Sequence, residues 1–459
     1  MLFRSPQQAD ALAKQLFPTH QAQISALLKG KFTPGSIINT LANQNIPTPL
    51  SDDALLSEIF SHAKQNIEAS HGEGYWIDHW TYILDLVENY LKIFPDQEQA
   101  FLFEEASILT FESPVTVFPR SEKTVLDQAG HVRQYGSIRH PDREKISRLQ
   151  LKEHGTNWLK DSHGRILQTT LYSKLVLLAM NKFALLDPEC MGIEMEANKP
   201  GWNDAMNGLP GLFASGVSET IELARLIDFL QNHHSNQAVL TLPVEFLTFL
   251  ERIQAIDYQD AYLAHLALAK AREEYREAIR FGSKGQHTIS DAAIRAFYPK
   301  AKAILDQGIQ KAITLGNGII PTYLTYEAKE YQVLQDANGQ SIKTHYGLPA
   351  VEVHSFTVKA LPAFLEAPAR LFKYTKDETL VRHMAQKIKQ SGVYDAALKM
   401  YKTSDDLDEY GYEIGRIRAF TKGWLEREAN FLHMTYKYLL GLLKSGQYDL
   451  FYEEAKDNF

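Results

Sequence analysis

The chain has 459 residues, of which 44% are hydrophobic, 11% aromatic and 23% charged, and its formal net charge is -8. This length and apolar content exclude a disordered or collagen-like chain, and the single cysteine, Cys190, excludes a disulfide scaffold. A chain of this size forms one large helical domain or two to three ordinary domains. Its acidic balance argues against nucleic acid as a partner, because phosphate-binding domains usually carry a basic excess.

Membrane and export signals are absent from the sequence pattern. The most apolar run, residues 175–180, is followed by Asn181 and Lys182, and it is far shorter than the roughly 18 residues that span a bilayer. The first residues lack the pattern of a secretory signal, and the lone cysteine is typical of a reducing compartment. We therefore expect a soluble cytoplasmic protein with no membrane partner, and the sequence leaves its oligomeric state open.

Helical periodicity dominates the chain. Residues 51–69 begin with the cap residue Ser51, and the same apolar period continues from Ile83 to Leu91, which predicts a helical hairpin. The loops between helices are very unequal in length, which favours a large toroid of helical hairpins over a bundle or a solenoid. The further segments predicted to be helical are residues 166–186, 219–232, 243–280, 289–315, 361–372, 377–391 and 421–445.

Three segments interrupt this helical pattern. Residues 113–165 are rich in charge and glycine and predict a long loop excursion, while residues 192–216 are dense in Gly, Pro and Asn. Residues 322–353 place β-prone residues before Asn338-Gly339, a strong signal for a β-hairpin. Because long loops on a rigid scaffold usually carry the binding residues, we expect the site among them.

The first candidate for catalysis is Asp78, which lies among Tyr75, Trp76 and Trp80 near a predicted helix start. An apolar aromatic setting disfavours the charged form of a carboxyl, so its pKa rises and it holds a proton at neutral pH. A general acid for a glycosidic oxygen needs this property. The alternative is that Asp78 only caps the helix.

The second candidate is the loop that contains Trp202, Asn203, Asp204 and Asn207. Its glycines and prolines predict a loop, and its aromatic, amide and carboxylate groups are those that bind the apolar face and the hydroxyls of a sugar. The alternative is a set of Asx turns that stabilises the loop.

The third candidate segment contains Trp424, Glu426 and Glu428 at the start of a predicted helix. At this spacing both carboxylates cannot face the same side of a helix, so we expect at most one of them in the site. The alternative is that both are exposed charges.

The remaining polar residues predict structural roles. Ser218 is expected to cap the following helix, with Glu219 and Glu222 as ordinary partners of the helix dipole. The histidines lack the spacing of a metal site, so we expect no metal. These histidines are His233, His234, His345 and His354.

The segment Trp202-Asn203-Asp204-Ala205-Met206-Asn207 resembles the Trp-Asn-Asp-Gly-Met-Asn loop of cellobiose phosphorylase and related inverting glycoside phosphorylases. In that family the general acid is an Asp two residues after an upstream Trp, as Asp78 is after Trp76, and here it precedes Asp204 by 126 residues. The chain differs in having Ala205 and no segment for the family's N-terminal β-sandwich, which suits a barrel-only relative or a fragment of a longer protein.

The resemblance implies one all-α catalytic domain over residues 1–459, an (α/α)6 barrel with a loop excursion at 113–165 and a β-hairpin insertion at 322–353. It implies an enzyme that cleaves a glycosidic bond with inversion, with Asp78 as acid, inorganic phosphate as co-substrate and no other cofactor. The residues that hold phosphate are not identified. The oligosaccharide would contact Tyr75, Trp76, Trp202, Asn203, Asp204, Asn207 and Trp424.

Three alternatives remain open. On the same barrel, an inverting hydrolase would use Glu428 or Glu426 to deprotonate a water molecule. The carboxyl groups of this base and of the acid would then be about 6.5 to 9.5 Å apart. A non-catalytic glycan-binding relative would keep the barrel without turnover. A terpenoid or peptide cyclase on a similar toroid fits less well, because the polar loop suits hydroxylated substrates.

Overall fold

The computed structural model describes residues 2–3, 5–64, 77–112, 116–136, 138–139, 158–196, 202–233 and 239–458. The sequence predicts one domain over residues 1–459, and contacts divide the chain into two compact units. The first unit consists mainly of residues 2–64, with short pieces at 111–112 and 158–159. The second unit contains the other described residues, from 77 to 458.

The N-terminal unit is a small helical fold with its own core. Ser5 caps its first helix, Thr33 and Ser36 form a capping box at its third, and Ser51 caps its fourth. Its buried side chains include Phe3 and Ile59, so strand and helix residues share one core. Its elements are β1 (Leu2–Phe3), α1 (Pro6–Leu16), α2 (Gln21–Lys29), α3 (Pro34–Asn43), α4 (Asp52–Ser61) and β2 (Ala63–Lys64).

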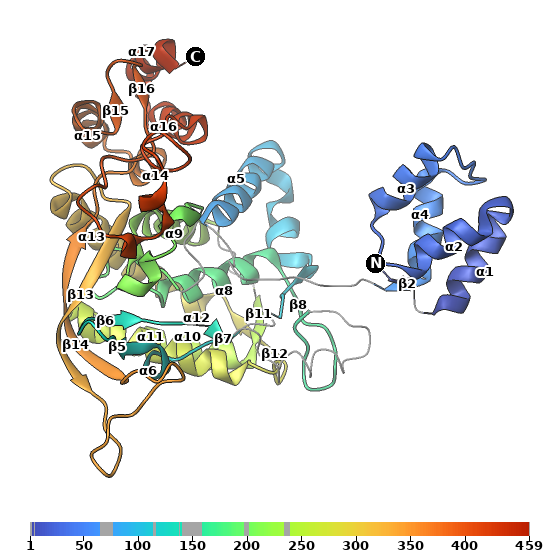
Figure 1. Ribbon diagram of the computed structural model, residues 1–459, viewed down its shortest axis with the longest axis horizontal. Coiled ribbons are helices and arrows are strands. Elements are labelled where there is room, and N and C mark those ends of the chain that lie inside the picture. The colour runs from blue at the N-terminus through green and yellow to red at the C-terminus, as the bar shows by residue number, and fades with distance from the viewer. Residues whose placement is uncertain are drawn as a thin grey trace. The chain divides into compact units, whose positions relative to one another are not determined.

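The second unit is predominantly helical (Figure 1). None of the helices described combines the length and the apolarity that crossing a bilayer requires. The α-helices of this unit are α5 (Ile77–Ile93), α6 (Arg120–Lys123), α8 (Leu171–Phe183), α9 (Val217–Asn232), α10 (Val244–Ala255), α11 (Ala261–Ala278), α12 (Ala292–Arg295), α13 (Tyr298–Leu315), α14 (Glu366–Tyr374), α15 (Glu378–Gln390), α16 (Leu432–Lys444) and α17 (Tyr448–Asn458).

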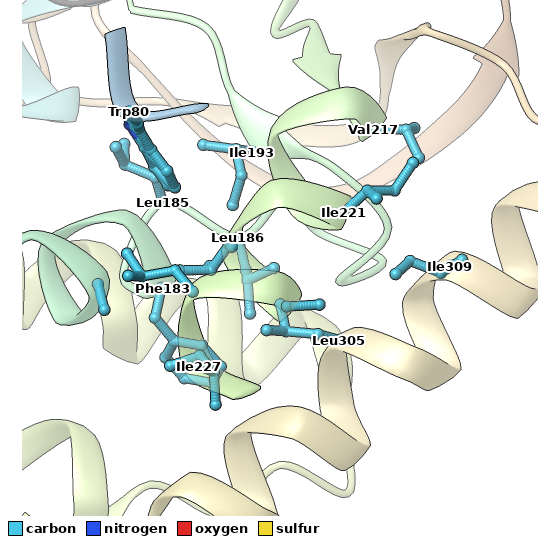
Figure 2. Packing of buried hydrophobic residues seen from close by; sticks show 14 of the residues in the cluster. Trp80, Phe183, Leu185, Leu186, Ile193, Val217, Ile221, Ile227, Leu305 and Ile309 are labelled. Carbon is cyan, nitrogen blue, oxygen red and sulfur yellow. The ribbon is translucent and has the colours of Figure 1, made fainter. Parts of the chain in front are cut away.

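Helix α9 is the centre of this unit. Most of its residues between Val217 and Leu230 are buried, and it packs against α5, α8, α13 and α14. Figure 2 shows Ile221 and Ile227 of α9 near Phe183 of α8 and Leu305 of α13. A helix buried on all sides is an unusual place for charged residues, and those that α9 carries therefore need partners.

A four-stranded sheet, in the order β14-β13-β10-β9, flanks the helices. Its long strands β13 (Tyr323–Val333) and β14 (Val351–Ala360) pair antiparallel and end in a projecting loop (Figure 1). The turn predicted at Asn338-Gly339 is present, because Gly339 has φ +76° and donates its N–H to the carbonyl of Asp336 at 3.0 Å. The hairpin thus belongs to a sheet and extends beyond residue 353.

The other strands form two-stranded ribbons. They are β3 (Ile108–Leu109) with β8 (Gln168–Thr169), β4 (Thr116–Val117) with β7 (Ile138–Arg139), β5 (Thr124–Leu126) with β6 (Val132–Gln134), β11 (Val239–Pro243) with β12 (Gln286–Ser290), and β15 (Tyr394–Asp395) with β16 (Met400–Tyr401). Within the excursion predicted at 113–165, the described strands β4, β5, β6 and β7 thus belong to β-ribbons. The sheet strands that precede α9 are β9 (Ile193–Glu194) and β10 (Ser215–Gly216).

Two local predictions are wrong. Of the two helices predicted to form a hairpin, α4 contributes to the core of the N-terminal unit and α5 to the core of the second unit. The helix predicted over residues 421–445 begins at Leu432, since Leu425 and Glu428 have φ of +50°, which a helix does not allow. Ser218 is not a cap, because α9 already begins at Val217 after Gly216.

Candidate functional site

The Trp202 loop, residues 202–212, folds onto a segment near residue 415. The loop forms two short 3-10 turns, Asp204–Met206 and Leu209–Leu212. Asp204 forms an ion pair with Arg416, and the side-chain oxygen of Asn207 accepts the backbone N–H of Arg416 at 3.0 Å. Asp204 and Asn207, which are predicted to bind sugar, thus both contact Arg416, a residue more than 200 positions later in the sequence.

Two glycines let these backbones touch. A Cβ added to Gly208 would lie 1.9 Å from the carbonyl oxygen of Glu413, and a Cβ on Gly415 would lie 2.5 Å from that of Ala205. Gly415 also has φ +124°, a conformation that other residues rarely adopt. Larger side chains at these positions would separate the two segments, so the glycines define how closely the loop docks.

An aromatic cluster lies beside the loop. The ring of Trp202 stacks on Phe431 with centroids 6.3 Å apart and an interplanar angle of 13°, and it lies 6.0 Å from His433. His433 in turn meets the edge of Tyr436 at 5.6 Å. Trp424 packs against Phe420 instead, and its side chain is 56% exposed. The second and third predicted segments therefore meet, although Trp202 and Trp424 do not stack on each other.

The two carboxylates predicted in the third segment have different environments. Glu428 is held by Lys402 at 3.5 Å and Lys422 at 3.4 Å, as expected for a structural charge. Burial raises the pKa of Glu426, and the nearby charge of Asp204 raises it further. Glu426, rather than Glu428, is therefore the carboxyl beside the Trp202 loop.

A buried polar layer joins the first two turns of three helices. Arg370 of α14 donates to Thr81 Oγ1 of α5 at 3.1 Å and to Glu222 Oε1 of α9 at 3.3 Å. Glu366, the first residue of α14, lies 3.6 Å from the same guanidinium. The side chains of Arg370, Glu222 and Glu366 are each at most 4% exposed. Buried charges of this kind require close partners, and each has one.

A second layer lies one turn further along the same helices. Lys373 of α14 contacts Asp85 of α5 at 2.6 Å, and Arg225 of α9 contacts Asp85 at 2.5 Å. Although burial alone would raise it, the hydrogen bond from Lys373 and the charge of Arg225 hold the pKa of Asp85 below its usual value. Because residue numbers increase together on α5, α9 and α14, the three helices run parallel and begin at the same end.

Tyr323 connects this layer with the Trp202 loop. Burial raises the pKa of its hydroxyl well above the usual value, and the charges of Glu366 and Glu219 raise it further. Asn203, which is fully buried, also lies within interaction distance of Tyr323. Glu219 is itself paired with Lys182 at 2.8 Å. The loop, the helix starts and the first residue of β13 therefore surround one polar region.

Part of the first predicted segment lies outside the described residues. Tyr75 and Trp76 are among these, and so is the side chain of Asp78, although Asp78 itself lies in the first turn of α5. The described side chains of this helix begin at position 79, and among them Thr81 belongs to the buried polar layer.

The residues of the buried polar layer were not predicted from the sequence as part of the site. Glu222 was expected to be an ordinary dipole partner, and Glu366, Arg370 and Tyr323 were not singled out. A usable signal existed in α9, where Glu222 and Arg225 stand three apart and the neighbouring residues 223, 224, 226 and 227 are all apolar. Such a pair within an apolar run indicates charges that are buried together.

Among the parts of the chain that the structure describes, no group of three or more His, Cys, Asp or Glu side chains is placed to hold a metal ion. Comparison of the chain with protein-family models and with curated protein sequences finds no match. The assignment of a function therefore depends on the geometry of the site.

Proposed function

We propose that the chain is a carbohydrate-active enzyme that cleaves a glycosidic bond with inversion on an (α/α)6 barrel. The observation that carries the proposal is the convergence of the Trp202 loop, the carboxyl of Glu426 and the first two turns of three parallel helices. Parallel helices that begin at one end are what the inner ring of such a barrel requires. Their aligned dipoles favour carboxylates at this end, where Glu219, Glu222 and Glu366 lie.

The composition of the region suits a sugar. Aromatic rings offer flat apolar surfaces, and Phe431, Tyr436 and Trp424 are between 38% and 56% exposed. Carboxylate, amide and hydroxyl groups at Asp204, Asn203 and the neighbouring side chains supply donors and acceptors for sugar hydroxyls. Asp78 remains the proposed general acid on the basis of the resemblance, in which an Asp two residues after a Trp has this role.

The described charges favour water over phosphate as the attacking group. The cations near the site are already paired with carboxylates: Arg416 with Asp204, Lys182 with Glu219, and Arg370 with Glu222 and Glu366. Glu426 forms no ion pair within the described part of the chain, and its raised pKa brings it closer to neutral, where a general base is most effective. We therefore propose hydrolysis with Glu426 as the base, and phosphorolysis as the alternative that the resemblance implies.

An assay with and without phosphate separates the two reactions. Oligosaccharides are incubated with the full chain, and reducing ends, sugar 1-phosphate and the anomeric form of the first product are measured. We expect cleavage at equal rates without phosphate and an inverted product. Glu426→Gln and Asp78→Asn should each lower kcat by about 100-fold or more, whereas Glu409→Gln, a change at an exposed carboxylate, should not.

Each other outcome has a definite meaning. Cleavage that requires phosphate and yields sugar 1-phosphate would overturn hydrolysis in favour of phosphorolysis. Binding of oligosaccharides without any turnover, unaffected by Asp78→Asn, would support the non-catalytic glycan-binding alternative.

A further inference from the structure

Two segments far apart in the sequence meet on the surface of the second unit. Val125 of β5 forms a β-bridge with Ala350, and the N–H of Leu126 donates to the carbonyl of Pro349 at 3.0 Å. The ribbon β5-β6 thereby adds to the tip of the β13-β14 hairpin. Both expected excursions, at 113–165 and at 322–353, thus contribute to one surface.

Four aromatic rings gather where these segments meet, and we call them the aromatic platform: Phe118, Tyr135, His345 and Tyr346. Phe118 stacks on His345 with centroids 4.7 Å apart at 28°, and His345 lies 4.1 Å from Tyr346. Tyr135 meets Tyr346 edge-on at 6.1 Å. Tyr346 is 50% exposed and Tyr135 is 38% exposed, so the platform presents ring surface to solvent.

The platform is held in a fixed arrangement. A Cβ added to Gly136, which has φ +46°, would lie 1.5 Å from the hydroxyl oxygen of Tyr346, so the ring lies directly against this backbone. The N–H of Tyr135 donates to the carbonyl of Lys123 at 2.8 Å, and the turn that presents His345 and Tyr346 is closed by Gly347 N–H to Thr344 O at 2.8 Å. Rigid aromatic side chains lose little conformational entropy when a ligand binds.

The platform is continuous with the Trp202 loop. The carbonyl oxygen of Gln134, one residue before Tyr135, lies within 3.5 Å of the Cβ position of Gly211 in that loop. Arg133 forms an ion pair with Glu413 at 2.9 Å, and Glu413 packs against Gly208 of the same loop. The ribbon that carries Tyr135 therefore contacts the loop that carries Trp202 within the same compact unit.

We propose that the aromatic platform binds a distal sugar residue of an oligosaccharide whose scissile bond lies at the Trp202 loop. The proposal rests on the proposed function, because it takes its ligand from the site with which the platform is continuous. The apolar face of a pyranose ring packs on an exposed aromatic ring, and Tyr135 and Tyr346 offer such faces with hydroxyls at their edges. The substrate class becomes a chain of several sugars rather than a disaccharide.

Affinity electrophoresis of the full chain tests this binding without requiring turnover. Native gels contain either hydroxyethyl cellulose or soluble starch, and each variant also carries Trp202→Ala, which removes binding at the candidate site. Tyr346→Ala and Tyr135→Ala should each weaken the affinity for the retarding polysaccharide by about tenfold. Tyr346→Phe should bind as before, which shows that the ring rather than the fold is responsible. The matched control is Tyr331→Ala, a 41% exposed tyrosine on β13.

The outcomes separate this proposal from the proposed function. If a polysaccharide retards the Trp202→Ala variant, and adding Tyr346→Ala abolishes this retardation, sugar binding at the platform is supported even if no oligosaccharide is ever cleaved. With an active enzyme, Tyr346→Ala should raise KM for a hexasaccharide about tenfold and leave the kinetics on a disaccharide unchanged. The proposal is overturned if neither polysaccharide retards the chain, or if Tyr346→Ala is retarded as strongly as Tyr331→Ala.

Discussion

Arg370 is the residue whose loss should most disturb the second unit. At an effective dielectric constant of about 20, each of its contacts with Glu222 and Glu366, at 3.3 and 3.6 Å, has a Coulomb energy of about 5 kcal/mol. The desolvation of the guanidinium offsets much of this energy. Arg370→Met, however, leaves two carboxylates buried without this cation, and we expect a loss of about 3–5 kcal/mol in the free energy of unfolding.

Hydrogen exchange in peptides that cover α9 and α14 measures this loss without a contribution from the N-terminal unit. Lys311→Met is the control, since its ion pair with Glu189 lies at the surface, with side chains 51% and 45% exposed, and should contribute at most about 1 kcal/mol. Adding Glu366→Gln to Arg370→Met should restore part of the stability, because it removes one uncompensated charge. A loss below about 1 kcal/mol for Arg370→Met would refute the reasoning.

Three further predictions concern stability. Gly441→Ala should lower the free energy of unfolding in urea by about 1–3 kcal/mol, because the added Cβ would lie 2.9 Å from Ala369 O of α14. An unchanged unfolding midpoint would show that α14 and α16 can move apart without cost. Burial lowers the pKa of Lys174 from 10.5 to about 8, so the folded state binds fewer protons than the unfolded state between these values and stability rises with pH there. Lys174→Met should therefore gain at most about 3 kcal/mol in urea unfolding at pH 7, and equal gains at pH 7 and pH 10.5 would contradict this. Ser51→Ala removes the cap that accepts the N–H of Ala54 and should cost about 1 kcal/mol, seen as faster hydrogen exchange in α4 with no change in α9.

The sequence was most informative where structure depends on neighbouring residues. The cap at Ser51, the helix start after Asp377 and the turn at Asn338-Gly339 are all present, because each is determined by contacts within a few positions. The polar and glycine-rich character of residues 192–216 also predicted the loop that carries Trp202 correctly. Each of these features could be predicted without knowing how the rest of the chain folds.

The polar layer could not be predicted in this way. Which carboxylate pairs with Arg370 depends on how α5, α9 and α14 align, and no local pattern contains that alignment. The environments of Glu426 and Glu428 could not be predicted for a related reason, since a helix would have placed these carboxylates differently from the turns that the chain forms. The two-unit division also depends on which core each helix joins, as α4 and α5 show.

The polar layer also has a consequence for the order in which the protein matures during synthesis. Thr81 is hydrogen-bonded to a residue 289 positions later, and Asp85 to one 288 positions later. A ribosome that adds about 5–20 residues per second needs roughly 15–60 s to cover that distance. Throughout this interval α5 has emerged without its α14 partner, and its charges remain in water. The candidate site is therefore completed late in translation. A nascent chain that stops before residue 370 contains the Trp202 loop but lacks Arg370 of α14, which completes the buried polar layer.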